Sequence, residues 1–184
     1  GDECMNVVQP IRDPVKIEKM KNYLKSKSER NYILFMLGIS VGLRISDILK
    51  LKKEDILRSH IDIKETKTKK NKRVKIPGYI KKEIIPYAKT LADGDYLIKS
   101  RQGANRPIDR STAYRILRDA AKHVGLTDIG THTLRKTFGY HFYMQTKNVA
   151  LLQELLNHSR PDITLRYIGI NQDTLDKAMD KFRI

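Results

Sequence analysis

The residues of this 184-residue chain that could do chemistry are mainly cations and imidazoles. His132 and Arg135 stand three positions apart, so a helix would present both on one face. An arginine there can hold a phosphate through two parallel hydrogen bonds, although a capping histidine beside a surface ion pair explains the same pattern. Arg44 follows the most apolar segment of the chain and has Asp47 nearby as a candidate ion partner. Both arginines are therefore candidates for phosphate binding or for structural ion pairs.

Two further segments carry candidate groups. His158 and Tyr167 stand nine residues apart, on either side of a Pro161-Asp162 helix start. The chain has nine tyrosines, and most of them must be structural, so Tyr167 stands out only through its neighbours. The segment 64–75 has seven Lys or Arg among its twelve residues and one acid. It predicts an exposed basic turn that contacts a polyanion, or a solvated loop.

Several familiar catalytic patterns are absent from the sequence. It has no phosphate-cradling G-x-x-x-x-G-K-[ST] loop and no H-E-x-x-H pair. The five histidines do not group with acids in a compact ligand pattern, and the acids form no paired clusters of the kind that two-metal nucleases need. We therefore expect no metal and no cofactor, and any DNA cleavage would use metal-free chemistry.

The composition narrows the class of protein. Lys and Arg number 37 against 21 Asp and Glu, a net charge of +16 with a pI near 9.9. Nucleic acid is the first candidate partner and an anionic membrane surface the second. The length and a 40% apolar content predict one soluble globular domain. No apolar run could span a bilayer, no segment is typical of a signal peptide, and the single Cys4 excludes an intrachain disulfide and favours a reducing compartment.

The elements that must position these groups are mostly helices. Asp13-Pro14 is a helix start, and the apolar run 32–41 predicts a buried helix. Isoleucine and valine alternate with polar residues at 61–63 and 74–76, which predicts two antiparallel strands, with a preceding strand near Ile56. Residues 1–12 lack a pattern and are interpreted as a tail or linker. Further helices are expected near 46–49 and over 80–91, where Pro86 would be a kink or break. In the C-terminal half, one helix is expected from 109 or 111 to about 124, a short one is expected to begin at 161, and three more are expected over 130–143, 149–156 and 173–183.

In this order, the segments resemble the tyrosine recombinase (phage integrase) family. GLRISDILKLKKEDI is similar to its first arginine box, and ETKTKKNKRVKIP to its lysine hairpin. THTLRKTFGYH is similar to its H-x-x-R box, and LLQELLNHSRPDITLRYI to its final histidine and tyrosine box. The resemblance runs from about residue 11 to the end. It departs at Asn157, where the family usually has a glycine, but Asn tolerates the same left-handed backbone.

The resemblance implies a role for each matched residue. Arg44 and Arg135 would bind the non-bridging oxygens of a scissile phosphate, with Asp47 orienting Arg44. His132 and His158 would add hydrogen bonds, His132 also exchanging a proton with the nucleophile. Tyr167 would form the 3′-phosphotyrosine link.

A hairpin lysine would protonate the leaving 5′ oxygen. Lys67, which precedes a threonine, matches best, and Lys69 is the rival. Strand parity cannot decide between them, because both share the parity of Ile61 and Ile63. The remaining hairpin cations would hold the DNA backbone without reading its sequence; the DNA-binding set is Lys64, Lys69, Lys70, Lys72 and Arg73.

For the whole chain, the resemblance implies a mainly α (α+β) catalytic domain over 13–184 with a small three-stranded antiparallel sheet. The family's N-terminal core-binding domain is expected to be absent. The partners would be double-stranded DNA and other protomers, docked through the apolar face of the helix at 173–183, with no membrane. The setting would be cytoplasmic and nucleoid-associated, in a bacterium or phage. A type IB topoisomerase-like enzyme and a non-catalytic DNA-binding module remain the alternatives.

Overall fold

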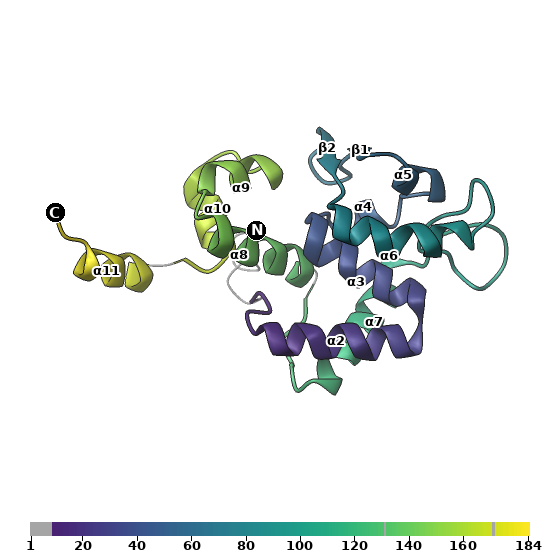
Figure 1. Ribbon diagram of the computed structural model, residues 1–184, viewed down its shortest axis with the longest axis horizontal. Helices are drawn as coiled ribbons and strands as arrows, with labels where there is room; N and C mark the ends of the chain where they lie inside the picture. Colours follow the sequence, from purple (N-terminus) through teal and green to yellow (C-terminus); the bar gives the residue numbers. More distant parts are fainter. Residues whose placement is uncertain (1–8, 131, 171) are drawn as a thin grey trace.

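Helices make up most of this protein, as expected. The computed structural model describes residues 9–130, 132–170 and 172–184, with the backbone alone for 172 and 173. Figure 1 shows the helices gathered around one body, with a short hairpin on one side. In chain order the elements are α2 (Pro14–Lys27), α3 (Glu29–Val41), α4 (Ile45–Ile48), α5 (Lys53–Leu57), β1 (His60–Lys64), β2 (Asn71–Lys75), α6 (Gly78–Lys89), α7 (Arg110–His123), α8 (Thr133–Thr146), α9 (Val149–Leu155), α10 (Pro161–Tyr167) and α11 (Gln172–Lys181).

Local sequence signals set several of these boundaries. The Asp13 carboxylate accepts a hydrogen bond from the Val15 backbone N–H at the start of α2, and Asp109 caps α7 through the Thr112 N–H at 2.7 Å. Pro86 lies inside α6 and does not end it. The start at Asp13 was therefore predicted correctly, and Asp109 is the cap among the two starts left open for α7, because a cap is a contact between neighbours in sequence. The start of α3, capped by Ser28, was not predicted.

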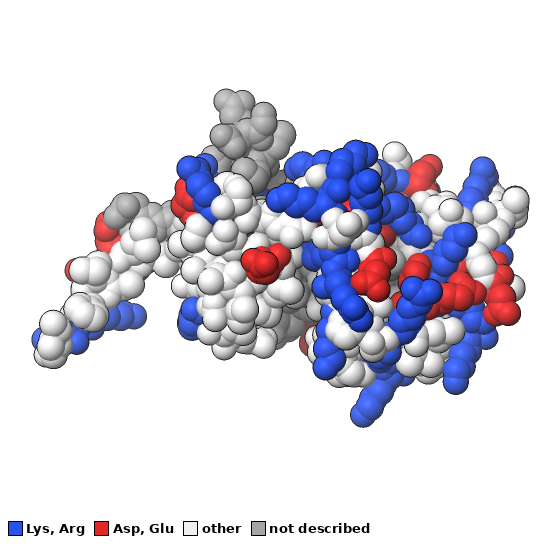
Figure 2. Space-filling view, turned by 90° about the horizontal axis from the view of Figure 1, so that it is seen from above, with Lys and Arg blue, Asp and Glu red and all other residues white. Residues whose placement is uncertain are grey.

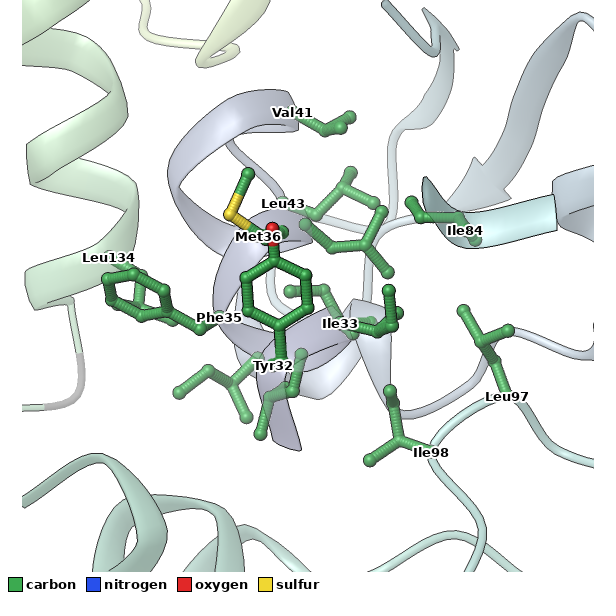
Figure 3. Close-up of a cluster of buried hydrophobic side chains, with 14 of the residues drawn as sticks. Tyr32, Ile33, Phe35, Met36, Val41, Leu43, Ile84, Leu97, Ile98 and Leu134 are labelled. Atoms are coloured by element: carbon green, nitrogen blue, oxygen red, sulfur yellow. The ribbon is translucent and has the colours of Figure 1, made fainter. Parts of the chain in front are cut away.

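The core is built around α3, whose buried side chains face helices on several sides (Figure 3). Phe35 of α3 lies next to Leu134 of α8 in this view, and both side chains are buried in the same cluster. Gly38 allows the close approach of the two helices, since a Cβ at that position would lie 2.4 Å from Leu134 Cδ1. The apolar run predicted to be a buried helix is thus the element against which α8 is placed.

The predicted antiparallel sheet is present, but the predicted number of three strands is wrong. Within the described residues the sheet has two antiparallel strands, with Ile61 opposite Val74 and Ile63 opposite Lys72. Ile56, assigned to a preceding strand, lies in the helix α5 instead. The Asp55 carboxylate accepts the Lys52 backbone N–H at 2.8 Å, and this local contact starts a helical turn where the sequence offered no alternating pattern.

The predicted tail is partly outside the described residues, which begin at residue 9. The remainder packs against the body: Ile11 is buried, its N–H donates to Thr137 Oγ1 at 2.9 Å, and its carbonyl lies 2.9 Å from His141 Nε2. A single apolar residue such as Ile11 forms no sequence pattern, so the sequence could not reveal that this segment packs against α8. The two residues in each contact are more than a hundred positions apart in the chain.

The last helices form a smaller cluster of their own. Leu152, Leu156, Tyr167 and Ile168 are buried together at the junction of α8, α9 and α10. Beyond them α11 stands away from the body (Figure 1), and its apolar residues Leu175, Met179 and Phe182 are 48%, 68% and 66% exposed. Within the described chain, no helix has the length and apolar character needed to cross a bilayer.

Candidate active site

A buried ion pair lies at the centre of the site. Arg44 follows Gly42, whose φ of 75° ends α3 in a left-handed turn, and its Nη1 lies 2.6 Å from Glu65 Oε2. The Glu65 side chain is fully buried and that of Arg44 is 12% exposed. A Cβ at residue 42 would lie 2.4 Å from a Phe138 ring carbon, so the turn needs both the conformation and the small size of glycine. The backbone that leaves α3 therefore aims Arg44 at the hairpin.

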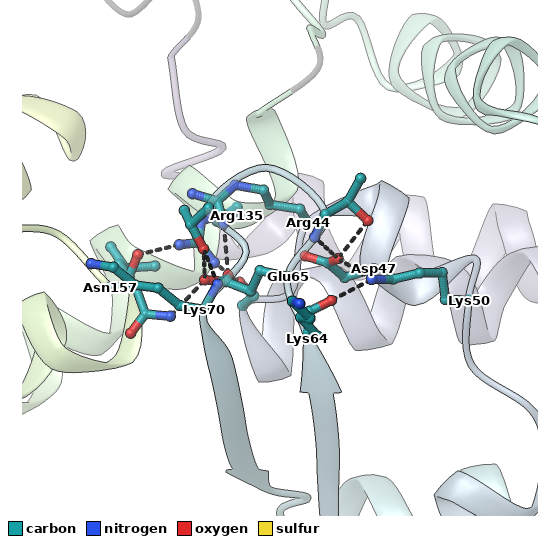
Figure 4. A network of polar contacts seen from close by, with 12 residues as sticks. Arg44, Asp47, Lys50, Lys64, Glu65, Lys70, Arg135 and Asn157 are labelled. Atoms are coloured by element: carbon teal, nitrogen blue, oxygen red, sulfur yellow. Dashed lines mark hydrogen bonds and ion pairs between the residues drawn. The ribbon is translucent and has the colours of Figure 1, made fainter.

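Glu65 also holds the hairpin in shape. Its Oε1 accepts hydrogen bonds from Thr68 Oγ1 at 2.9 Å and from the side-chain amide of Asn157 (Figure 4). Burial raises the pKa of Glu65, but the hydrogen bonds from Asn157 and Thr68 and the charges of Arg44 and Lys72 outweigh it and hold that pKa below its ordinary value. The carboxylate is therefore ionised at neutral pH and links the first arginine box, the hairpin and the final box.

Asp47 has a different task from the one expected. Its Oδ1 accepts the Thr66 backbone N–H at 3.0 Å and lies 3.1 Å from Lys50 Nζ, so this buried carboxylate anchors the base of the hairpin turn. The ion partner of Arg44 is Glu65. Sequence reasoning chose Asp47 because it is near Arg44 along the chain, whereas Glu65 was visible only as the single acid of the basic turn.

Arg135 joins the remaining segments to this cluster. It is 2% exposed, and its guanidinium donates to the carbonyl of Gly42 at 2.6 Å and to the carbonyl of Leu156. One side chain of α8 thus connects the end of α3 with the end of α9. Asn157, which follows Leu156, has a φ of 55°, so it keeps the left-handed turn expected of a glycine and adds the amide that binds Glu65.

The two histidines lie beside the tyrosine. The His158 and Tyr167 rings have centroids 5.0 Å apart, and the His132 ring is 6.5 Å from that of Tyr167. Burial, followed by nearby cations, lowers the pKa of each histidine to about 4, so both are neutral at pH 7. His158 Nδ1 lies 2.9 Å from Thr164 Oγ1, which fixes the ring against α10. Each neutral imidazole can donate one hydrogen bond and accept another.

Tyr167 itself is buried. It is 5% exposed, and Lys136 Nζ lies 5.2 Å from its ring centroid. Burial raises the pKa of Tyr167 to about 12, against the opposing charges of Arg135 and Arg44. In this conformation the hydroxyl is therefore protonated and screened from solvent, and the ring belongs to the small cluster of α9 and α10.

The hairpin lysines separate clearly in space. Lys67 lines a cavity of about 370 Å³ together with Arg44, Thr66 and His132. Lys69 sits in the turn with a φ of 60°, its side chain exposed and absent from that lining. The cavity favours Lys67 over its rival. Arg110 and Tyr114 of α7 also line this cavity, and they carry no sequence signal because they precede the His132 box without a recognisable motif.

The other hairpin cations lie on the surface, with one exception. Lys64, Lys70 and Arg73 are exposed, whereas Lys72 is half-buried. Figure 2 looks from the side on which the hairpin stands in Figure 1. Lys and Arg side chains cover much of that face of the main body, while the part formed by α9 and α10 is largely uncharged. The exposed hairpin cations therefore lie next to the site, on the same hairpin as Lys67 and Glu65.

Comparison with known proteins gives two kinds of relative. Residues 13–173 match the phage integrase family. The probable integrase/recombinase YoeC of Bacillus subtilis is 51% identical over 179 residues, which are 97% of this chain and 98% of YoeC. The tyrosine recombinase XerA of Thermococcus onnurineus is 28% identical, over 91% of this chain and 61% of XerA. The chain thus spans nearly all of YoeC but about three-fifths of that XerA.

Solved structures share the fold. A crystal structure of XerA recombinase matches with a TM-score of 0.77 and 22% identity, over 96% of this chain and 67% of that one. The catalytic domain of bacteriophage HP1 integrase matches with a TM-score of 0.64 and 21% identity, over 94% and 95% of the two chains. XerH, solved in a post-cleavage complex with its difH substrate, matches with a TM-score of 0.73 and 19% identity over 95% of this chain and 53% of that chain.

The central carboxylate can be tested by stability. Glu65→Gln keeps the volume of the side chain and leaves Arg44 without its counter-charge, so we expect the free energy of unfolding at pH 7 to fall by about 3 kcal/mol, as for other broken buried ion pairs. Because the folded pKa of Glu65 is depressed, its contribution is present above the unfolded value of 4.5 and is lost as the pH falls below it. Urea unfolding of both proteins from pH 7 to pH 3 measures this.

Asp62→Asn is the matched control. Asp62 lies on the same hairpin, and its side chain is 55% exposed. Its Oδ1 lies 3.7 Å from Arg73 Nε, and surface ion pairs of this kind contribute roughly 0–1 kcal/mol to the free energy of unfolding. Equal effects of the two substitutions would show that Glu65 is not the structural centre of the site.

Proposed function

This chain belongs to the phage integrase family, and from that premise we propose that it breaks and rejoins DNA through a covalent bond to Tyr167. Residues 13–184 would form the catalytic unit, acting on double-stranded DNA as a cytoplasmic, nucleoid-associated protein of a bacterium or phage. The observation that carries the proposal is the convergence of four distant boxes on one cation-rich site: Arg135 bonds the carbonyls of Gly42 and Leu156, while Glu65 pairs with Arg44 and Asn157.

In the proposed first step, Tyr167 Oη attacks the phosphorus and passes its proton to a base. His132 is the candidate base, because its neutral imidazole lies beside Tyr167 and a bound phosphate would raise the pKa that burial and the neighbouring cations lower. The P–O5′ bond breaks as the P–Oη bond forms, and Lys67 gives a proton to the departing 5′ oxygen. The products are a 3′-phosphotyrosine and a free 5′-hydroxyl. Rejoining is the reverse: a 5′-hydroxyl attacks the phosphorus and Tyr167 leaves, so the bond energy is retained throughout.

Arg44 and Arg135 would stabilise the charge that develops on the non-bridging oxygens. Both guanidiniums are held by the protein before substrate arrives, which is what makes such groups effective in a site with little water. Arg44 Nε is a buried donor with no partner among the described residues, and a phosphate oxygen would supply one. These features support phosphate binding by the two arginines.

Attack also requires Tyr167 to leave its present contacts. A hydroxyl that is buried with a pKa of about 12 is a weak nucleophile at neutral pH. The charges of Arg135 and Arg44 already act on this tyrosine, and burial opposes them. We therefore propose that binding of DNA loosens the packing around Tyr167, so that the arginine charges favour its ionised form. The exposed hairpin cations would contribute contacts to the DNA backbone that are blind to sequence and weaken as salt rises.

Assembly into several protomers is the second part of the proposal. The apolar residues of α11 are exposed on a helix that stands away from its own body (Figure 1). An exposed apolar face of this kind is typical of an interaction surface. We propose that α11 docks on a neighbouring protomer when several copies assemble on DNA, and that the isolated protein is a monomer or associates weakly.

Covalent trapping tests the central claim. On a DNA duplex with a nick next to the cleavage position, the short 5′-hydroxyl strand diffuses away, so wild-type protein should accumulate as an adduct that survives detergent. Tyr167→Phe should form none while still binding DNA. A binding module would yield no adduct from either protein. Relaxation of supercoiled plasmid without any preferred site would favour the topoisomerase alternative.

The lysine assignment has a chemical test. Lys67→Ala should reduce the cleavage rate by at least about 10²-fold, the usual contribution of a general acid. A substrate with sulfur in place of the bridging 5′ oxygen should restore cleavage, because a thiolate leaves without protonation. Lys69→Ala should lose only one backbone contact and cleave normally at saturating protein. Full cleavage by Lys67→Ala together with loss in Lys69→Ala would reverse the assignment.

The role of α11 is tested by surface charge. Leu175→Glu with Met179→Glu should leave the Tm unchanged, because both side chains are about half or more exposed, but should abolish complexes of several protomers on DNA. Lys177→Glu, on the same helix, is the matched control and should still assemble. Gel-shift stoichiometry and removal of residues 173–184 check the result, and unchanged assembly after that removal would contradict it.

A further inference from the structure

Lys72 does not point where the rest of the basic hairpin points. On β2, Val74 and the following Ile76 are 5% and 1% exposed and face the core, while Arg73 and Lys75 face solvent. Lys72 shares the inward parity of Val74, lies opposite Ile63 in the strand register and is half-buried. Its side chain therefore runs along the inner face of the hairpin.

The inner face leads to the catalytic cluster. The charges that act on Lys72 come from three segments: Arg135 on α8, Glu65 in the hairpin turn, and Arg44 and Asp47 at the start of α4. The charge of Lys72 in turn acts on His158, in the loop before α10. Lys72 thus lies among the groups that surround the proposed phosphate position, on the side of His158, whereas Lys67 lies on the side of His132.

The cluster carries more positive charge than it can compensate. The cations that act on Lys72 are Arg135 and Arg44, and the carboxylates are Glu65 and Asp47. With Lys72 itself, three positive charges face two negative charges, so one positive charge is left over among largely buried side chains. A surplus of this kind is costly unless an anion neutralises it. A phosphodiester brings one negative charge, and the state in which the tyrosine oxygen attacks it brings nearly two.

We propose that Lys72 is a further catalytic residue, whose ammonium binds a non-bridging oxygen of the scissile phosphate beside Arg44 and Arg135. The inference rests on the proposed function and adds a third phosphate-binding cation to it. Lys72 supplies charge, while the proton for the leaving oxygen still comes from Lys67. No metal or further reactant is needed for this role.

The electrostatics of the cluster agree with this assignment. Burial, then the neighbouring Arg135, lowers the pKa of Lys72 to about 8. A bound phosphate would raise the pKa of Lys72 again. At a pH between 8 and the pKa of Lys72 in the DNA complex, binding of DNA is therefore accompanied by uptake of a proton. The contribution of Lys72 to binding is therefore complete below pH 8 and is lost as the pH rises through the pKa of the complex.

The experiment compares two lysines of the same strand. Lys72→Met keeps the length of the side chain and removes its charge, and Lys75→Met does the same on the exposed face. Adduct formation on the nicked duplex should fall by about 10²-fold in Lys72→Met, the usual effect of losing one preorganised group, and stay near wild type in Lys75→Met. Lys72→Arg should recover part of the rate.

Three further readouts separate this role from others. The Tm of Lys72→Met should rise, because the charged lysine is disfavoured in the folded protein; a structural lysine would lower the Tm. In the Tyr167→Phe background, DNA affinity should fall between pH 7 and pH 9 while Lys72 is present, and should change less once Lys72→Met is added. The 5′-sulfur substrate should not restore cleavage by Lys72→Met.

The outcomes are distinct from those for the proposed function. If wild-type protein forms no adduct, the proposed function fails. If wild type forms the adduct and the rates of Lys72→Met and Lys75→Met are equal, the inference about Lys72 fails alone. Restoration of Lys72→Met by the sulfur substrate would make Lys72 the proton donor and would also overturn the inference.

Discussion

The ion pair between Arg44 and Glu65 is the contact on which the arrangement of the site depends. A fully buried carboxylate is stable only when its oxygens are occupied, and here an arginine, a threonine and an asparagine occupy them. Those three donors come from the first arginine box, the hairpin turn and the final box. Because the alternative is an unpaired charge in the protein interior, the hairpin is held in the position that places Lys67 beside Arg44 and His132 in one cavity.

A second constraint follows from the first. The protein holds its arginines with carbonyls and one carboxylate instead of neutralising them fully, since Arg135 bonds two backbone oxygens. Such a site keeps its guanidiniums fixed while leaving their charge available to a ligand. The same surplus, added to burial, explains why the neighbouring histidines are neutral at pH 7. Cations that favour an incoming anion disfavour a protonated imidazole.

The resting position of Tyr167 fits this balance. Its ring completes the small apolar cluster at the end of α10, so packing holds the Tyr167 hydroxyl protonated and screened from water. In the proposed function, the stability of that cluster and the reactivity of the tyrosine are opposed. A proposed nucleophile held in this way would not be exposed before substrate has supplied the compensating contacts.

The sequence by itself determined the helices with local caps, the buried run of α3, the antiparallel hairpin and the order of the boxes, and the family likeness confirmed the fold class. These features depend on neighbours in the chain, which a pattern can record. The tertiary structure decided that Glu65, and not Asp47, pairs with Arg44; that Ile56 is helical; and that Lys72 turns inward. The Arg44–Glu65 pair and the burial of Lys72 depend on segments brought together in space, whereas the turn at Ile56 depends on the local contact of Asp55 with Lys52, which the strand pattern did not record. Burial then sets the charge state of each group, and a linear sequence holds no measure of burial.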